Sequence, residues 1–106
     1  MNPQLAADQA ENRAIAGYRD PVEMEFRREA ADLIEKVGWA QGHWRRPTGE
    51  ICADEALIVV CKVAPLELFD SLVSNLEREL GLDLRLFNDT PGRTKEQVLA
   101  ALRGTK

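Results

Sequence analysis

The amino-acid sequence predicts a mostly α-helical protein, folded as a compact bundle of about four helices. Three observations predict this fold class. Apolar residues recur at intervals of three and four along several segments, as one face of a helix requires. Capping residues precede two of these segments, and glycines follow the segments at their ends. We expect helices at 21–37, 53–63, 65–80 and 95–103.

The first helix carries the clearest signals. Asp20 suits the N-cap, Pro21 the first helical position, and Glu23 has capping-box spacing from Asp20. Gly38 predicts the end of the helix. Its expected core-facing residues are Val22, Phe26, Ala30, Leu33, Ile34 and Val37. Its charged residues predict a solvated face with i,i+4 pairs: Glu23, Glu25, Arg27, Arg28, Glu29, Asp32 and Lys36.

The middle of the chain leaves two alternatives open. The turn signal at 47–49 predicts an irregular connection, or a short β-hairpin over 43–52. Asp54 and Glu55 suit a helix start, but the branched run at 58–60 also favours a strand. The segment 56–63 is therefore helix or strand, and its apolar character nearly all round predicts that it is buried.

Three elements follow. Pro65 opens a helix that Gly81 ends, and alternating leucines at 82–87 predict a short strand. After a turn at 88–92, Thr94 and Gln97 have capping-box spacing and begin the last helix. The residues expected to be buried on the apolar faces are Phe26, Leu33, Leu57, Phe69, Leu72, Leu76 and Leu99.

Length and charge limit the organisation and the partners. At 106 residues the chain matches one domain, which we place at 20–106 after an N-terminal arm, 1–19, that is flexible or weakly helical. The net charge of −4 argues against general binding to nucleic acids or anionic membranes. Apolar runs are far shorter than the roughly 20 residues of a membrane span. We expect a cytoplasmic protein with Cys52 and Cys61 as reduced thiols.

Catalytic chemistry has little support in the sequence. Cys52 and His43 form the only nucleophile–base pairing to consider, and no orienting third group accompanies them. A buried structural thiol is the better interpretation of Cys52. The cysteine and histidine spacings match no zinc motif. We therefore expect no enzymatic activity, no metal and no cofactor.

Two candidate binding sites remain. The loop at 41–46 brings together residues that favour contact with a protein partner or a second copy of the chain: His43, Trp44, Arg45 and Arg46. The second candidate is an anion- or ligand-binding site at the start of the last helix, formed by Asn88, Asp89, Arg93 and Thr94. A turn that caps the last helix would explain these residues equally well, except for Arg93, which such a turn does not require.

Two stretches resemble a known family. They are Gly38-Trp39-Ala40-Gln41-Gly42 and Phe87-Asn88-Asp89-Thr90-Pro91-Gly92-Arg93-Thr94, with Cys52 before the middle helix. Together they resemble a family of short proteins of unknown function from actinobacteria and their phages, over about residues 22–103. That family usually has Trp where Phe87 stands and a Gly-containing step where Ala53-Asp54-Glu55 stands. The resemblance implies a compact helical fold and no particular chemistry.

The sequence thus favours a non-enzymatic protein-interaction or regulatory accessory module. An anion- or ligand-binding domain that uses Arg93 is the alternative.

Overall fold

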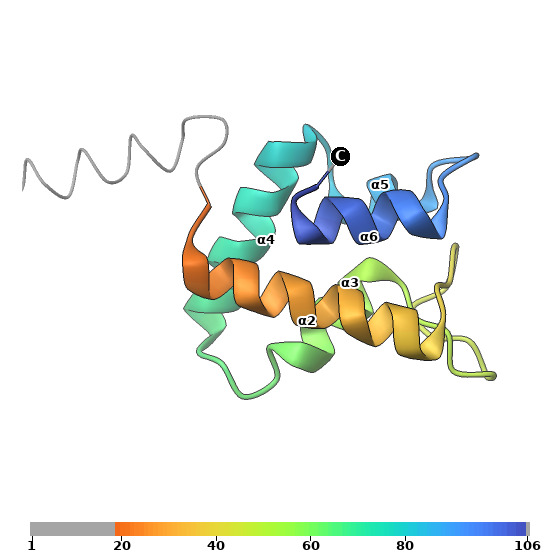
Figure 1. Cartoon of the computed structure of the whole chain (residues 1–106), viewed down its shortest axis with the longest axis horizontal. Helices are drawn as coiled ribbons and strands as arrows, with labels where there is room; N and C mark the ends of the chain where they lie inside the picture. Colours follow the sequence, from red (N-terminus) through yellow and green to blue (C-terminus); the bar gives the residue numbers. More distant parts are fainter. Residues whose placement is uncertain (1–18, 106) are drawn as a thin grey trace, which may run out of the picture.

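The computed structural model describes residues 19–105, so the predicted arm lies outside the described residues except for Arg19. Within this range the chain forms five helices, which confirms a mostly helical bundle. They are α2 (Pro21–Val37), α3 (Ala53–Val60), α4 (Leu66–Leu80), α5 (Leu84–Asp89) and α6 (Lys95–Arg103). Figure 1 shows them along the chain. None of these helices combines the length and apolar character that crossing a membrane needs.

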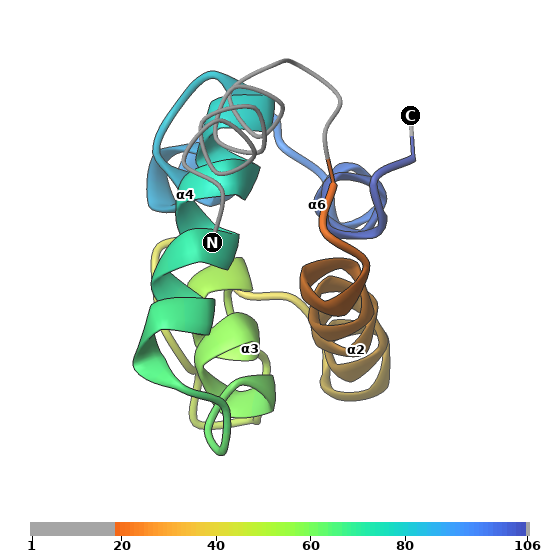
Figure 2. The same ribbon diagram turned by 90° about the vertical axis from the view of Figure 1, so that its left-hand side faces the viewer.

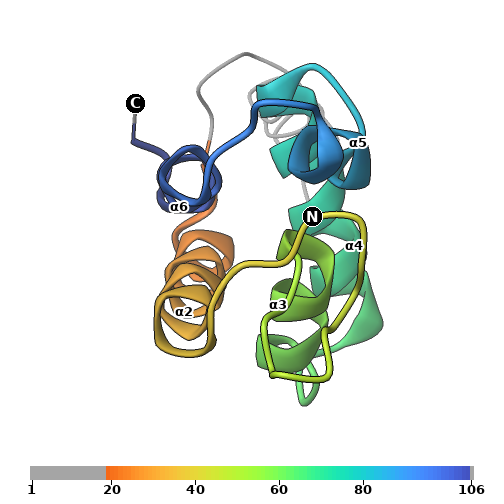
Figure 3. The ribbon, with the colours of Figure 1, turned by 90° about the vertical axis from the view of Figure 1, so that its right-hand side faces the viewer.

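The helices form two layers. The end-on views show α2 and α6 stacked in one layer, facing α3, α4 and α5 in the other (Figures 2 and 3). α2 packs against α3 and α6, and α5 packs against α3 and α4. The core between the layers consists mainly of small and branched apolar residues, among them Ala30, Ile34, Ile51, Ala56, Leu57, Leu72, Leu76, Leu84, Val98 and Leu102.

α2 has the predicted bounds because its ends are locally encoded. The Asp20 carboxylate accepts hydrogen bonds from the amides of Val22 and Glu23. Gly38 ends the helix with a φ of +100°. A Cβ there would lie 2.7 Å from Cγ of Glu50, so a larger residue would also have to displace that side chain.

The buried face of α2 differs from the prediction. Glu23 and Arg27, expected on the solvated face, are only 6% and 3% exposed, whereas Val22 is exposed and Phe26 and Leu33 are half-buried. The carboxylate of Glu23 accepts hydrogen bonds from Ser71 and Asn75 of α4. Apolar periodicity predicts which face of a helix is buried. It does not predict which polar side chains become buried through hydrogen bonds to other helices.

Arg27 joins three helices. Its Nε donates to the carbonyl of Leu102 at 2.9 Å and Nη2 to that of Ala101 at 2.7 Å. Its Nη1 pairs with Glu79 of α4 at 3.0 Å. These contacts satisfy the Leu102 carbonyl at the end of α6, and they add to the bond that the Ala101 carbonyl accepts from the amide of Gly104. Although burial opposes ionisation, the bonds from Arg27 and Arg19 hold the pKa of Glu79 below its ordinary value.

α3 resolves the helix-or-strand alternative in favour of a helix. It ends at Val60 rather than at 63, and the next residues form tight turns, with Ala64 N bonded to the carbonyl of Cys61. Pro65 disfavours the helical conformation at Ala64, so α3 does not continue into α4. The expected burial of 56–63 is wrong in part, because Ile58, Val59 and Val63 are exposed.

The predicted hairpin over 43–52 is reduced to isolated bridges of Ile51 with Trp39 and with Arg45. The predicted strand at 82–87 is wrong, because α5 occupies this region. Asp83 caps α5 by accepting bonds from the amides of Arg85 and Leu86. Leu84 and Phe87 are buried and Leu86 is 63% exposed, which is helical and not alternating spacing.

The predicted core is mostly confirmed. Leu57, Leu72, Leu76 and Leu99 are buried as expected. Phe26, Leu33 and Phe69 are instead partly buried and pack against the edge of the core. Small residues of α2 and α3 fill the centre, and the rings of Phe26 and Phe69 lie at its edge.

Candidate functional site

The two stretches that carry the family resemblance meet in space through Asn88. This side chain is 1% exposed. Its Oδ1 accepts bonds from Nε1 of Trp39 at 2.7 Å and the amide of Ala53 at 3.0 Å. Its Nδ2 donates to the carbonyl of Ala40 at 3.0 Å and to Oδ1 of Asp89 at 2.9 Å. Asn88 thus ties α5 to the loop after α2 and to the start of α3.

Gln41 and Asp89 extend this connection. Nε2 of Gln41 donates to the carbonyl of Thr90 at 2.9 Å, and Asp89 accepts from the amide of Gly42 at 2.9 Å. Burial opposes ionisation of Asp89, but the bonds from Gly42 and Asn88 lower its pKa overall. We call Trp39, Gln41, Asn88 and Asp89 the motif clasp. Its side chains bond to one another and to nearby backbone groups, so they hold the loop against α5.

The anion-site candidates do not converge on a shared pocket. Asn88 and Asp89 belong to the motif clasp. Arg93 lies with its guanidinium 3.8 Å from the centre of the Phe87 ring, and its Nε donates to the Phe87 carbonyl at 2.9 Å. Thr94 and Gln97 form the predicted capping box. Each residue therefore has a structural partner. This includes Arg93, which a capping turn by itself does not require.

The loop at 41–46 lies at the surface. His43, Trp44, Arg45 and Arg46 are all exposed, with Trp44 at 43%. The backbone of Trp44 is held in place because its carbonyl accepts a bond from the amide of Cys52 at 3.0 Å. The guanidinium of Arg85, on α5, lies 5.4 Å from the Trp44 ring centre. The sequence did not predict this partner, which lies far along the chain.

Both cysteines are buried free thiols. Sγ of Cys52 caps α3 by accepting a bond from the amide of Glu55 at 3.4 Å. Burial raises the pKa of the thiols of Cys52 and Cys61. His43 is exposed in its loop, so the geometry favours structural thiols over the nucleophile hypothesis.

Acidic side chains surround the start of α3. Burial raises the pKa of Asp54 to about 6, and the charges of Asp83 and Glu77 add to this effect while Arg85 opposes it. These neighbours have structural roles, because Asp83 caps α5 and Glu77 accepts a bond from the amide of Leu84.

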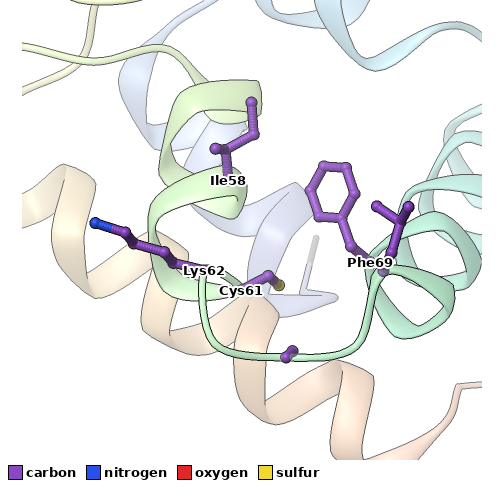
Figure 4. Close-up of a pocket in the computed structure, with 6 residues that line it drawn as sticks. Ile58, Cys61, Lys62 and Phe69 are labelled. Carbon is purple, nitrogen blue, oxygen red and sulfur yellow. The ribbon is translucent and has the colours of Figure 1, made fainter.

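A surface that sequence reasoning missed lies where α3 turns into α4. Four large apolar side chains are exposed there: Ile58 by 40%, Val59 by 37%, Val63 by 93% and Leu66 by 69%. Beside them is an open groove of about 380 Å³, lined by Ile58, Cys61, Lys62, Ala64, Leu66 and Phe69 (Figure 4). We call these exposed side chains and the groove the α3–α4 corner. The sequence signal for this surface was Pro65, which separates α3 from α4 and leaves Val63 on the turn between them and Leu66 at the start of α4.

The fold and these surfaces define a small two-layer helical domain with an exposed apolar corner. The chain belongs to a family of unknown function, DUF6197, whose model matches residues 19–106. No curated protein and no solved structure matches the sequence.

Proposed function

We propose that this domain is a non-enzymatic protein-binding module, with an accessory or regulatory role, and that the α3–α4 corner is its docking surface. The observation that carries the proposal is the exposure of four large apolar side chains within the nine residues from Ile58 to Leu66. Single exposed apolar residues are ordinary on protein surfaces, but a contiguous apolar patch is typical of an interaction site.

The construction of the corner supports the same function. A turn before a helix does not need large apolar residues, and polar ones would serve its backbone equally well. Here Val63 extends into solvent almost completely, while Phe69 and Ile58 line a recess beside it. Binding hot spots cluster in desolvated pockets, and this recess offers such a pocket to a partner.

The loop that contains Trp44 is a second contact area in this proposal. Trp44 and Arg85 present an aromatic ring and a cation together, and both residue types are enriched at binding hot spots. Arg45 and Arg46 would add to the association rate more than to the affinity.

Affinity capture from a lysate of the source cells tests the proposal. The wild-type chain should retain a specific protein that Val63→Glu loses at least about tenfold. Leu86→Glu is the matched control, because Leu86 is also exposed, at 63%, but lies on α5. The captured protein is then identified and the binding repeated with purified components. Equal capture by all three chains would contradict a docking role for the corner, and Trp44→Ala reports separately on the loop.

A further inference from the structure

We propose that the α3–α4 corner binds a second copy of this chain, so that two molecules pair about a two-fold axis. The inference rests on the proposed function and names the partner. It follows from the shape of the corner and from the charges around it.

The shape of the corner is self-complementary. Val63 and Leu66 are 93% and 69% exposed. Leu66 lines the groove together with Phe69, and Val63 lies in the chain between the lining residues Lys62 and Ala64. A two-fold axis makes every contact reciprocal, so the protruding residues of each copy can fill the groove of the other. Figure 4 shows Ile58 and Phe69 on opposite sides of this recess, one from each helix.

The charges at the rim are also self-complementary. Lys62 lies on the α3 side of the corner, and Glu67 and Asp70 lie on the first turns of α4; all three are exposed. When two corners pack antiparallel, Lys62 of each copy faces the acidic residues of the other. A partner carrying one sign of charge would match only one side of the rim. Charges placed at a rim mainly set orientation and specificity.

The corner offers four exposed large apolar side chains, so we expect a reversible rather than an obligate dimer. A stable interface buries roughly 800 Å² on each partner, with an apolar centre and a polar rim. Ile58, Val59, Val63 and Leu66 supply the centre, and the rim charges complete it. A monomer–dimer equilibrium that depends on concentration is the expected behaviour.

Sedimentation of the full chain over a range of concentrations tests the inference. The wild type should show a monomer–dimer equilibrium, and Val63→Glu should raise the dissociation constant at least about tenfold. Leu66→Glu provides an independent variant with the same expectation. Leu86→Glu should leave the constant within about twofold. Circular dichroism checks that each variant is folded.

A charge exchange tests the orientation. Lys62→Glu should weaken the dimer about fivefold, and adding Glu67→Lys to that chain should restore most of the loss, because the pair then meets with its signs reversed. A wild type that stays monomeric throughout, a dimer that survives both apolar substitutions, or a charge exchange without recovery would overturn the inference.

These outcomes separate the inference from the proposed function. If the chain is monomeric but Val63→Glu abolishes capture of another protein, the second-copy inference fails and the docking surface stands. If the corner supports neither self-association nor capture, both fail.

Discussion

The indole of Trp39 donates a 2.7 Å hydrogen bond to Oδ1 of Asn88, and the same oxygen accepts the amide that begins α3. One buried amide side chain therefore fixes the relative positions of three segments. The family-like stretches thus contain a structural element rather than an exposed recognition motif.

Replacing Asn88 should strongly destabilise the fold. Asn88→Ala leaves the Trp39 indole, the Ala53 amide and the Ala40 carbonyl without their partner, at a cost of about 3 kcal/mol. Urea unfolding measures this. A double-mutant cycle with Trp39→Phe isolates the shared bond, and a coupling energy near zero would refute the direct link.

Core truncations should differ in cost with burial. Leu76→Ala removes a fully buried side chain and should cost about 2–5 kcal/mol. Phe69→Ala removes a half-buried ring that lines the groove, so its cost should be smaller, about 1–2 kcal/mol. Thermal or urea unfolding of the two variants gives the order. The reverse order would mean that Phe69, not Leu76, anchors the core.

Helix ends were predictable because they depend on neighbouring residues. Asp20, Thr94 and the glycines at 38, 81 and 104 act within one turn of their helices. The burial of Asn88 and Arg27 was not predictable, because their partners lie as far as 49 and 75 residues away. The segment 82–87 predicts a strand because its leucines alternate, but six residues are too few to distinguish the period of a strand from that of a helix. Asp83 as an N-cap is the feature that favours the helix. The sequence did not predict the α3–α4 corner, because composition does not show whether an apolar segment is covered by the rest of the fold or left exposed.

The thiols should be unreactive in the folded protein. Burial raises the pKa of Cys52 and Cys61, so less thiolate is present at neutral pH than for a free cysteine. A colourimetric disulfide reagent should react slowly with the native chain and rapidly after unfolding in urea. Fast native labelling of Cys52 would restore the nucleophile hypothesis.

Asp54 should make stability fall as pH rises. Its pKa is about 6 in the folded protein against an ordinary value of 3.8. Within that window the folded chain holds a proton that the unfolded chain has released, so stability declines with increasing pH. Asp54→Asn should therefore gain about 1–2 kcal/mol at pH 7 and almost nothing at pH 4. Unfolding curves of the wild type and of Asp54→Asn at pH 7 and pH 4 check this. An equal gain in stability at the two pH values would show that titration of Asp54 is not its source.

Arg93 offers a test of the anion-site alternative. Arg93→Ala loses the contact with the Phe87 ring and the bond to its carbonyl, at a cost of about 1 kcal/mol. If these contacts are its whole role, the loss of melting temperature should be the same with and without phosphate. A phosphate-dependent stabilisation of the wild type that Arg93→Ala removes would instead support an anion site.

Arg27 should couple local unfolding at the end of α6 to the rest of the domain. A helix usually frays at its ends, so the amides there exchange hydrogen faster than those of the interior. Unwinding the last turn of α6 would strip the carbonyls of Ala101 and Leu102 from a guanidinium that is almost fully buried. The last turn of α6 should therefore exchange together with α2 as one cooperative unit, although α6 is only nine residues long.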